Sequence, residues 1–193
     1  MSIAQSKPDQ LVDIQKIIPT IKLDIRYATT NNFTGKAVYP VATGSPVKCF
    51  LQKPVALALK KVQEELATLD LSLKVFDGYR PLSVQYKFWQ LVPDERYVAD
   101  PKKGSRHNRG CAVDVTLIKL DGSEVIMPTE FDDFTERAHS NYMNLPKEAI
   151  ANRKTLRDVM ERHGFTVLAT EWWHFDYNGW MQYPILDIPL EKL

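Results

Sequence analysis

The chain has 193 residues, of which 44% are apolar and 25% are charged. This length predicts one domain spanning residues 1–193, in which about the first 20 residues form an extension. The 25 basic residues nearly balance the 24 acidic ones, which argues against a nucleic-acid-binding surface. No stretch is apolar enough for a membrane-spanning helix, so neither nucleic acid nor a membrane is an expected partner.

The N-terminal segment lacks the apolar region of a signal peptide. This predicts a cytoplasmic location, with the periplasm as the alternative. The two cysteines, Cys49 and Cys111, are too far apart for a Cys-x-x-Cys motif. They fit a reducing compartment, and a single disulfide is the alternative. Nothing in the sequence assigns an oligomeric state.

Hydrophobic periodicity and turn residues predict the elements of the first half of the chain. In order, these are a strand over 21–27, a loop over 29–35, a helix over 54–69, a strand over 71–76, a turn at 77–78, a helix over 83–91 and a loop over 93–109. Pro54 suits the first turn of its helix.

The second half of the chain adds more strands than helices. The pattern predicts a strand over 111–118, a hairpin turn over 120–124, a return strand over 125–127, a helix over 147–163, and strands over 165–169 and 172–177. Gly164 sits where a glycine commonly ends a helix. Helices mixed with hairpins, rather than regular β-α-β alternation, favour an α+β domain.

One candidate segment contains His107, with Asp114 seven residues later in an apolar strand. A buried acid without a partner is costly, so Asp114 needs a cation, a metal ion or several hydrogen-bond donors. Taken alone, a metal site and a capped loop explain Asp114 equally well. Cys111 faces the other side of this strand and is expected to be a core thiol.

A second candidate segment contains Glu171 and His174 among aromatic residues. In a regular strand these two side chains face opposite sides. Both reach one site only if Glu171 lies on the preceding turn or a bulge redirects it. By itself, the segment is slightly better explained as a core strand with a surface Glu. His163 is expected to stabilise a helix end, and His139 is ambiguous.

Together the two segments point to a metal centre. Two His and one Asp are a common open set of zinc ligands that leaves a position for water, and a nearby Glu can act as a base. Such ligands also accept other divalent ions. Arg80, which follows a turn, is alone best explained as a surface residue. Beside a metal, it would donate hydrogen bonds to an oxyanion or a carboxylate.

These motifs resemble the zinc D-Ala-D-Ala metallopeptidases and, within that group, the D-alanyl-D-alanine dipeptidases. The resemblance runs from about Arg26 to Tyr177. Five motifs carry it: Arg26-Tyr-Ala-Thr with Asn32-Phe-Thr-Gly, Asp77-Gly-Tyr-Arg-Pro, Ser105-x-His-x-x-Gly-x-Ala-x-Asp114, Phe131-Asp with Glu136-Arg-Ala-His, and Glu171-Trp-Trp-His174. It implies an α+β domain with a central antiparallel sheet flanked by helices, as in the zinc domain of hedgehog proteins.

The resemblance also implies catalytic roles. The ligands of one Zn²⁺ would be His107, Asp114 and His174. Glu171 would be the general base and then the general acid. Arg80 would hold the carbonyl oxygen of the scissile bond as it becomes an oxyanion.

Substrate-binding roles follow from the same resemblance. Tyr27 and Asp132 would meet the substrate's ammonium group, and Ser105 would meet its terminal carboxylate. The implied substrate is a small dipeptide, and the implied reaction is hydrolysis of D-Ala-D-Ala to two D-alanines.

Two alternatives remain at this stage. One is a D,D-carboxypeptidase that trims peptidoglycan stem peptides, and the other is a non-catalytic binding module stabilised by zinc. The segment between Trp89 and Ser105 is shorter than in the vancomycin-resistance members, which implies a more open site. Cys111 stands where another small residue is usual, and the strand pattern makes this a change in packing.

Overall fold

The computed structural model describes residues 10–39 and 46–193 of the chain. A five-stranded sheet has the order β2 (Lys22–Leu23), β4 (Leu71–Asp77), β5 (Ala112–Lys119), β7 (Glu171–Tyr177) and β6 (Phe165–Leu168). All neighbouring strands are antiparallel except β2 and β4, which are parallel. A smaller antiparallel sheet joins β1 (Leu11–Asp13) to β3 (Phe50–Gln52). The expected α+β architecture is confirmed.

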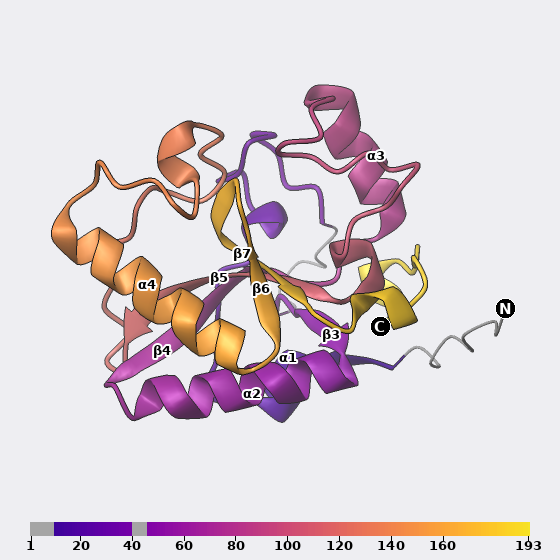
Figure 1. The fold of residues 1–193 in the computed structure, drawn as a ribbon. Helices are drawn as coiled ribbons and strands as arrows, with labels where there is room; N and C mark the ends of the chain where they lie inside the picture. The colour runs from indigo at the N-terminus through magenta and orange to yellow at the C-terminus, as the bar shows by residue number, and fades with distance from the viewer. Residues whose placement is uncertain (1–9, 40–45) are drawn as a thin grey trace, which may run out of the picture.

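Four α-helices accompany these sheets in the described part of the chain: α1 (Ile14–Ile17), α2 (Lys53–Ala67), α3 (Leu82–Leu91) and α4 (Lys147–Arg162). Short 3-10 helices occupy Arg26–Ala28, His107–Arg109, Glu136–Ala138, Trp180–Gln182 and Leu190–Lys192. Figure 1 shows α2 and α4 side by side against the sheet, with α3 at the opposite end of the molecule. None of these helices combines the length and apolarity that crossing a bilayer requires.

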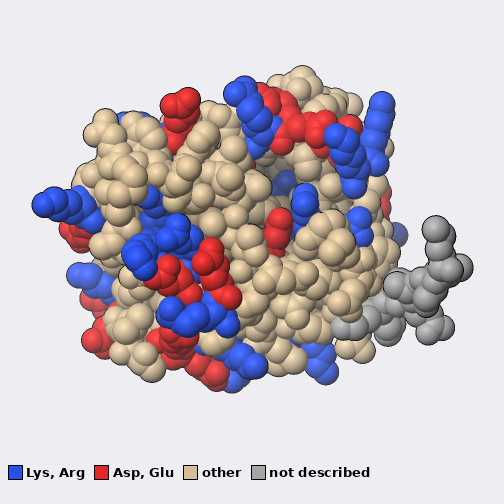
Figure 2. Space-filling view, viewed as in Figure 1, with Lys and Arg blue, Asp and Glu red and all other residues tan. Residues whose placement is uncertain are grey.

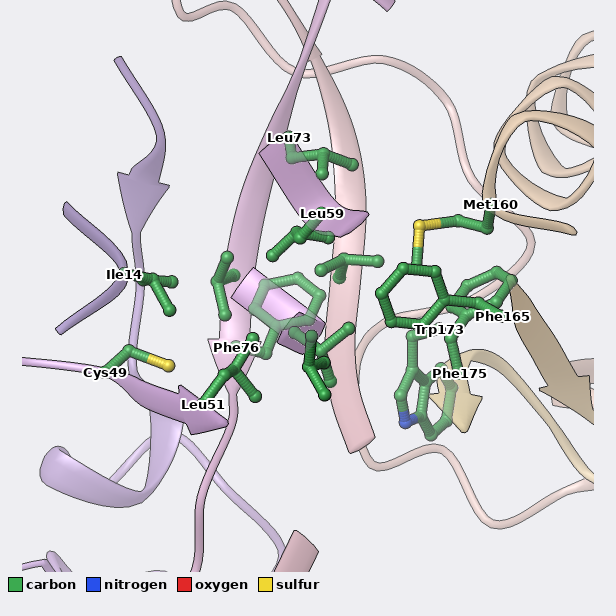
Figure 3. Close-up of a cluster of buried hydrophobic side chains, with 14 of the residues drawn as sticks. Ile14, Cys49, Leu51, Leu59, Leu73, Phe76, Met160, Phe165, Trp173 and Phe175 are labelled. Carbon is green, nitrogen blue, oxygen red and sulfur yellow. The ribbon is translucent and has the colours of Figure 1, made fainter. Parts of the chain in front are cut away.

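The hydrophobic core lies between the sheet and the two long helices. Apolar residues at helical spacing place one face of α2 inward, and Leu59 on that face is fully buried. Figure 3 shows Leu59 near Leu73 of β4, and Met160 of α4 near Trp173 and Phe175. This packing explains why the periodicity of both helices predicts them within two residues at each end.

Two predicted strands are wrong. Within residues 21–27, only Lys22–Leu23 pairs with β4, and the chain then turns into a 3-10 helix. Here Arg26 bonds the side chain of Asp24 and stacks over Phe76 of β4, so the segment packs on the sheet through side chains and not as a paired strand. The predicted return strand over 125–127 is reduced to one bridge between Ile118 and Glu124, because the backbone beyond it turns toward α4.

The remaining predicted helices and strands are confirmed within two residues. The predicted loop over 93–109 ends in a 3-10 turn at His107–Arg109. Cys49 and Cys111 are both buried free thiols, so the disulfide alternative is wrong. Cys111 is fully buried in the core, as expected from the strand pattern.

Candidate active site

Strand pairing brings the first two candidate residues together. Asp114 of β5 lies directly opposite His174 of β7 in the antiparallel register. Directly opposed side chains on one face of a sheet lie close together. His174 Nδ1 is 3.0 Å from Asp114 Oδ1, and both side chains are buried.

His107 reaches the same point from the 3-10 turn before β5. Gly110, with φ of +65°, ends this turn in the left-handed conformation that glycine tolerates. The His107 Nδ1 atom lies 2.7 Å from the Gly78 carbonyl oxygen. That carbonyl comes close because Gly78 has no side chain: a Cβ atom there would lie 2.4 Å from Cys49 Sγ.

Both imidazole rings have their orientation fixed by a partner on the far nitrogen. A carbonyl oxygen only accepts hydrogen bonds, so Nδ1 of a neutral His107 carries the proton and Nε2 keeps its lone pair. His174 Nε2 lies 2.9 Å from Asp176 Oδ1, which leaves the lone pair of His174 on Nδ1. Such partners are typical of metal-binding histidines.

The resulting triangle of donor atoms fits a divalent cation. Its sides are 3.0 Å (His174 Nδ1 to Asp114 Oδ1), 3.1 Å (His107 Nε2 to His174 Nδ1) and 3.4 Å (His107 Nε2 to Asp114 Oδ1). Zinc bonds of about 2.0–2.1 Å in tetrahedral geometry place ligand atoms roughly 3.3 Å apart. Three lone-pair donors this close repel one another unless a cation lies between them.

The pKa of His174 reflects the same need for positive charge. Burial lowers this pKa, but the carboxylates of Asp176 and Asp114 outweigh burial and raise it well above the usual value. In the absence of a metal ion, a proton therefore supplies the cation that these groups require.

Glu171 lies beside this triangle because β7 is irregular. The register between β6 and β7 shifts between Val167, opposite Phe175, and Leu168, opposite Glu171. The bulge turns Glu171 inward, with Oε2 at 3.9 Å from His174 Nδ1. Of the two explanations of this segment, the surface Glu is wrong and the bulge is confirmed. Burial raises the pKa of the Glu171 carboxyl to about 8, against a smaller lowering by His174.

Arg80 is buried and held on three sides, so its description as a surface residue is wrong. Its Nε and Nη2 atoms donate to Asp77 Oδ2 at 3.1 and 2.8 Å, and Nη1 donates to Gln85 Oε1 at 2.8 Å. The guanidinium also stacks over the Tyr27 and Phe88 rings. Its Nη2 atom lies 4.0 Å from Asp114 Oδ2, which places a fixed cation at the edge of the donor triangle.

Tyr27 and Asp132 meet at another wall of the site. The Tyr27 hydroxyl donates to Asp132 Oδ1, and the Phe33 N–H donates to Oδ2, both at 3.0 Å. Asp132 has φ of +63°, a strained conformation for a residue with a side chain. Burial raises the pKa of Asp132 to about 7 despite these two hydrogen bonds.

Ser105 lies at the entrance to the His107 turn. Its Oγ atom accepts a hydrogen bond from the His107 N–H at 3.2 Å, which leaves the hydroxyl proton to donate elsewhere. All eight residues chosen from the sequence line one cavity of about 120 Å³: Tyr27, Arg80, Ser105, His107, Asp114, Asp132, Glu171 and His174. Figure 2 shows the molecule hollowed on this face, with acidic and basic side chains around the opening.

The segment between α3 and the His107 turn forms one wall of this cavity, from Glu95 to Ala99. The Tyr97 ring stacks on Phe134 with centroids 4.9 Å apart, and the Thr170 hydroxyl donates to the Arg96 carbonyl oxygen at 2.9 Å. This short segment therefore contacts two neighbouring parts of the cavity wall, one through Phe134 and the other through Thr170.

Sequence reasoning missed three residues that support the site: Asp77, Gln85 and Asp176. Asp77 and Gln85 hold Arg80, and Asp176 orients His174. Asp176 lies two residues after His174, so the two-residue period of a strand could have found it.

The two other histidines lie outside the cavity. His163 Nε2 lies 2.7 Å from Glu65 Oε2, which ties the end of α4 to α2 and confirms a structural role. His139 follows the 3-10 helix Glu136–Ala138, and its carbonyl oxygen accepts from Arg153.

Comparison with known proteins gives a consistent family. A family model described as D-ala-D-ala dipeptidase matches residues 7–187. The D-alanyl-D-alanine dipeptidase of Escherichia coli (strain K12) is 37% identical, and the match covers 94% of this chain and 91% of that protein. The enzyme of the same name from Enterococcus faecalis (strain ATCC 700802 / V583) is 33% identical over 84% of this chain and 88% of its own length.

Two solved structures are similar at lower identity. The LdcB LD-carboxypeptidase is 21% identical with a TM-score of 0.46, over 72% of this chain and 66% of that one. The D,D-dipeptidase VanXYg, in complex with a D-Ala-D-Ala phosphinate analog, is 23% identical with a TM-score of 0.44, over 77% and 57%. On the family model and the two dipeptidase sequences, the chain belongs to the Peptidase_M15 family of D-Ala-D-Ala dipeptidases.

Proposed function

We propose that this protein is a zinc-dependent dipeptidase that hydrolyses D-Ala-D-Ala to two D-alanines. The observation that carries the proposal is the arrangement of Glu171 beside the donor triangle of His107, Asp114 and His174. Glu171 is buried, and its Oε2 atom lies 3.9 Å from His174 Nδ1, beyond hydrogen-bonding distance. A carboxyl group held beside the donor triangle, with its pKa raised by burial, has the position and the chemistry of a general base for a water molecule there.

Zinc is the proposed metal because the donor set is two imidazoles and one carboxylate at tetrahedral spacing. The ligands would be His107 Nε2, Asp114 Oδ1 and His174 Nδ1. When bound, the ion supplies Lewis-acid chemistry that makes water acidic and polarises a carbonyl group.

Glu171 moves the proton in this proposal. Its carboxylate accepts a proton from the attacking water, and the hydroxyl oxygen bonds to the carbonyl carbon of the peptide. The carboxyl group then gives the proton to the leaving amine as the C–N bond breaks. A carboxyl whose pKa lies near neutrality suits both steps.

Arg80 stabilises the negative charge that develops on the carbonyl oxygen. Its guanidinium is fixed by Asp77 and Gln85 before substrate arrives. A preorganised donor in a site that excludes water stabilises an oxyanion far better than a mobile surface arginine can.

The chemical groups at the two ends of the substrate distinguish a dipeptidase from a carboxypeptidase. A free dipeptide carries an ammonium group, which pairs with the buried carboxylate of Asp132 beside the Tyr27 hydroxyl. In a stem peptide the corresponding nitrogen is acylated and carries no charge. Binding such a peptide would leave Asp132 buried without a cation. Ser105 is the proposed donor to the terminal carboxylate.

The test is D-alanine release by zinc-loaded protein from D-Ala-D-Ala and from N-acetyl-D-Ala-D-Ala. Rapid release from the free dipeptide alone supports the dipeptidase and the role of Asp132. Release mainly from the blocked peptide would instead establish a carboxypeptidase. No release from either, with zinc bound, would leave the non-catalytic binding module.

A further inference from the structure

Arg106 is an arginine of the cavity that has no role in the steps above. It lies between Ser105 and His107 and lines the cavity. Its guanidinium stacks on the Trp180 ring, 4.6 Å from the centroid. The Arg106 Nε atom is buried and lies 3.3 Å from Asp176 Oδ2, without the geometry of a hydrogen bond.

Within residues 10–39 and 46–193, the side chain of Arg106 donates no hydrogen bond. The two other arginines that line the cavity differ in this respect. Arg80 donates from all three of its nitrogens to Asp77 and Gln85. Arg96 forms a two-pronged ion pair with Asp94 outside the cavity. Arg106 therefore offers a stacked, planar donor group whose Nε atom lies near Asp176 but makes no hydrogen bond.

The charges of the cavity make a carboxylate difficult to bind without such a donor. Five acidic side chains line it: Glu95, Asp114, Asp132, Glu171 and Asp176. The Ser105 hydroxyl can donate one hydrogen bond and carries no charge. The carboxylate of the substrate would be repelled by these groups unless a cation lies close to the position where it binds.

We infer that Arg106 binds the terminal carboxylate of the dipeptide together with Ser105, and so sets the preference for a free C-terminal acid. The inference rests on the proposed function. A guanidinium matches a carboxylate through two parallel hydrogen bonds, and 43% of the Arg106 side chain is exposed, which leaves it room to turn toward the substrate. Stacking on Trp180 limits the orientations that the group must give up on binding.

The experiment compares two substrates that differ only at this end, D-Ala-D-Ala and D-alanyl-D-alaninamide. Arg106→Gln should lower kcat/KM for the acid about 10- to 100-fold, mainly through KM, and leave the amide nearly unchanged. Arg106→Lys keeps the charge but loses the planar fork, so it should fall between. Arg96→Gln removes an arginine from the same cavity and is the matched control, expected to keep the preference for the acid.

Three results would overturn the inference. An equal loss on both substrates, or loss of bound zinc from the Arg106→Gln protein, would make Arg106 a positioning residue that acts through Asp176 and His174. Wild-type kinetics in Arg106→Gln would remove it from the site. If the wild-type protein hydrolyses D-Ala-D-Ala, these results leave the proposed function intact, whereas a wild-type protein inactive on the dipeptide removes both.

Discussion

The core between the sheet and α2 and the cavity at the end of β5 and β7 are both buried, yet they contribute in opposite ways. In the core, Leu59, Leu73 and Met160 lose contact with water and pack against one another, which stabilises the fold without any ligand. In the cavity, Asp114, Glu171 and two imidazoles face each other with too few donors. The core therefore supplies the stability that allows a group of mutually repelling, reactive side chains to be held together in the cavity.

The largest expected effect is on turnover. Glu171→Gln should lower kcat about 10²- to 10⁴-fold because it removes the group that accepts and returns the proton. Zinc should remain bound, since Glu171 is not among the three ligands, and the free energy of unfolding should not fall. Steady-state kinetics, metal analysis and urea unfolding check the three statements. Near wild-type kcat in this variant would contradict the role of Glu171.

Mutation of the core should have the opposite effect, lowering the free energy of unfolding without changing kcat. Leu59→Ala leaves a cavity beneath α2 and should lower the free energy of unfolding by about 2–5 kcal/mol, with kcat unchanged in the folded protein. The control on the same helix is Leu57→Ala, whose side chain is 44% exposed and which should cost well under half as much. Urea unfolding of both variants measures the difference. Similar losses from the two would mean that burial against the sheet does not set the cost, because alanine is the better helix former at both positions.

Removal of the metal ion from the cavity should lower the stability of the whole fold. Zinc at 100 times its dissociation constant should stabilise the protein by about 2.7 kcal/mol, because the ion relieves the repulsion among the three donor atoms. Thermal unfolding with and without a chelator measures this difference. His174→Ala should abolish the response to zinc, whereas His163→Ala, which alters the contact with Glu65, should preserve it. Equal zinc responses in the two variants would place the metal elsewhere.

The smallest expected effect concerns Asp132 and pH. Its pKa is raised to about 7, so below that pH the folded protein holds a neutral carboxyl that cannot pair with the substrate's ammonium group. That ammonium group, with a pKa of about 8, stays charged, so KM should rise on acidification, up to about tenfold per pH unit. Asp132→Asn should raise KM at pH values above about 7, where the wild-type carboxylate is charged, and abolish this dependence. An unchanged pH profile in the variant would assign the titration to another group.

Much of the fold is predictable because its pattern is local. The faces of α2 and α4 repeat at helical spacing, and Gly164 takes the left-handed conformation expected after a helix. The prediction of a strand over 21–27 was wrong because alternation alone does not show where hydrogen bonding to the neighbouring strand ends. There, the paired strand ends at Leu23, and the side chain of Asp24 accepts a hydrogen bond from Arg26.

The site was predictable as a set of residue types but not as a network. Spacing in the chain and resemblance to a family indicated His107, Asp114 and His174, and strand register brings the last two together. No local pattern reveals that Gln85 contacts Arg80 or that a bulge redirects Glu171. These depend on how separate segments meet, which a single sequence does not encode in any short window.

The two histidines proposed to bind the metal ion differ in how easily mutation can disturb their orientation. His174 takes its orientation from the side chain of Asp176, so one codon change can disconnect it. His107 takes its orientation from the backbone carbonyl of Gly78, which every amino acid retains, and a larger residue there collides with Cys49. Position 176 is thus the adjustable half of the centre, where a laboratory search for altered metal preference would find viable variants, and position 78 is the half fixed by the course of the chain.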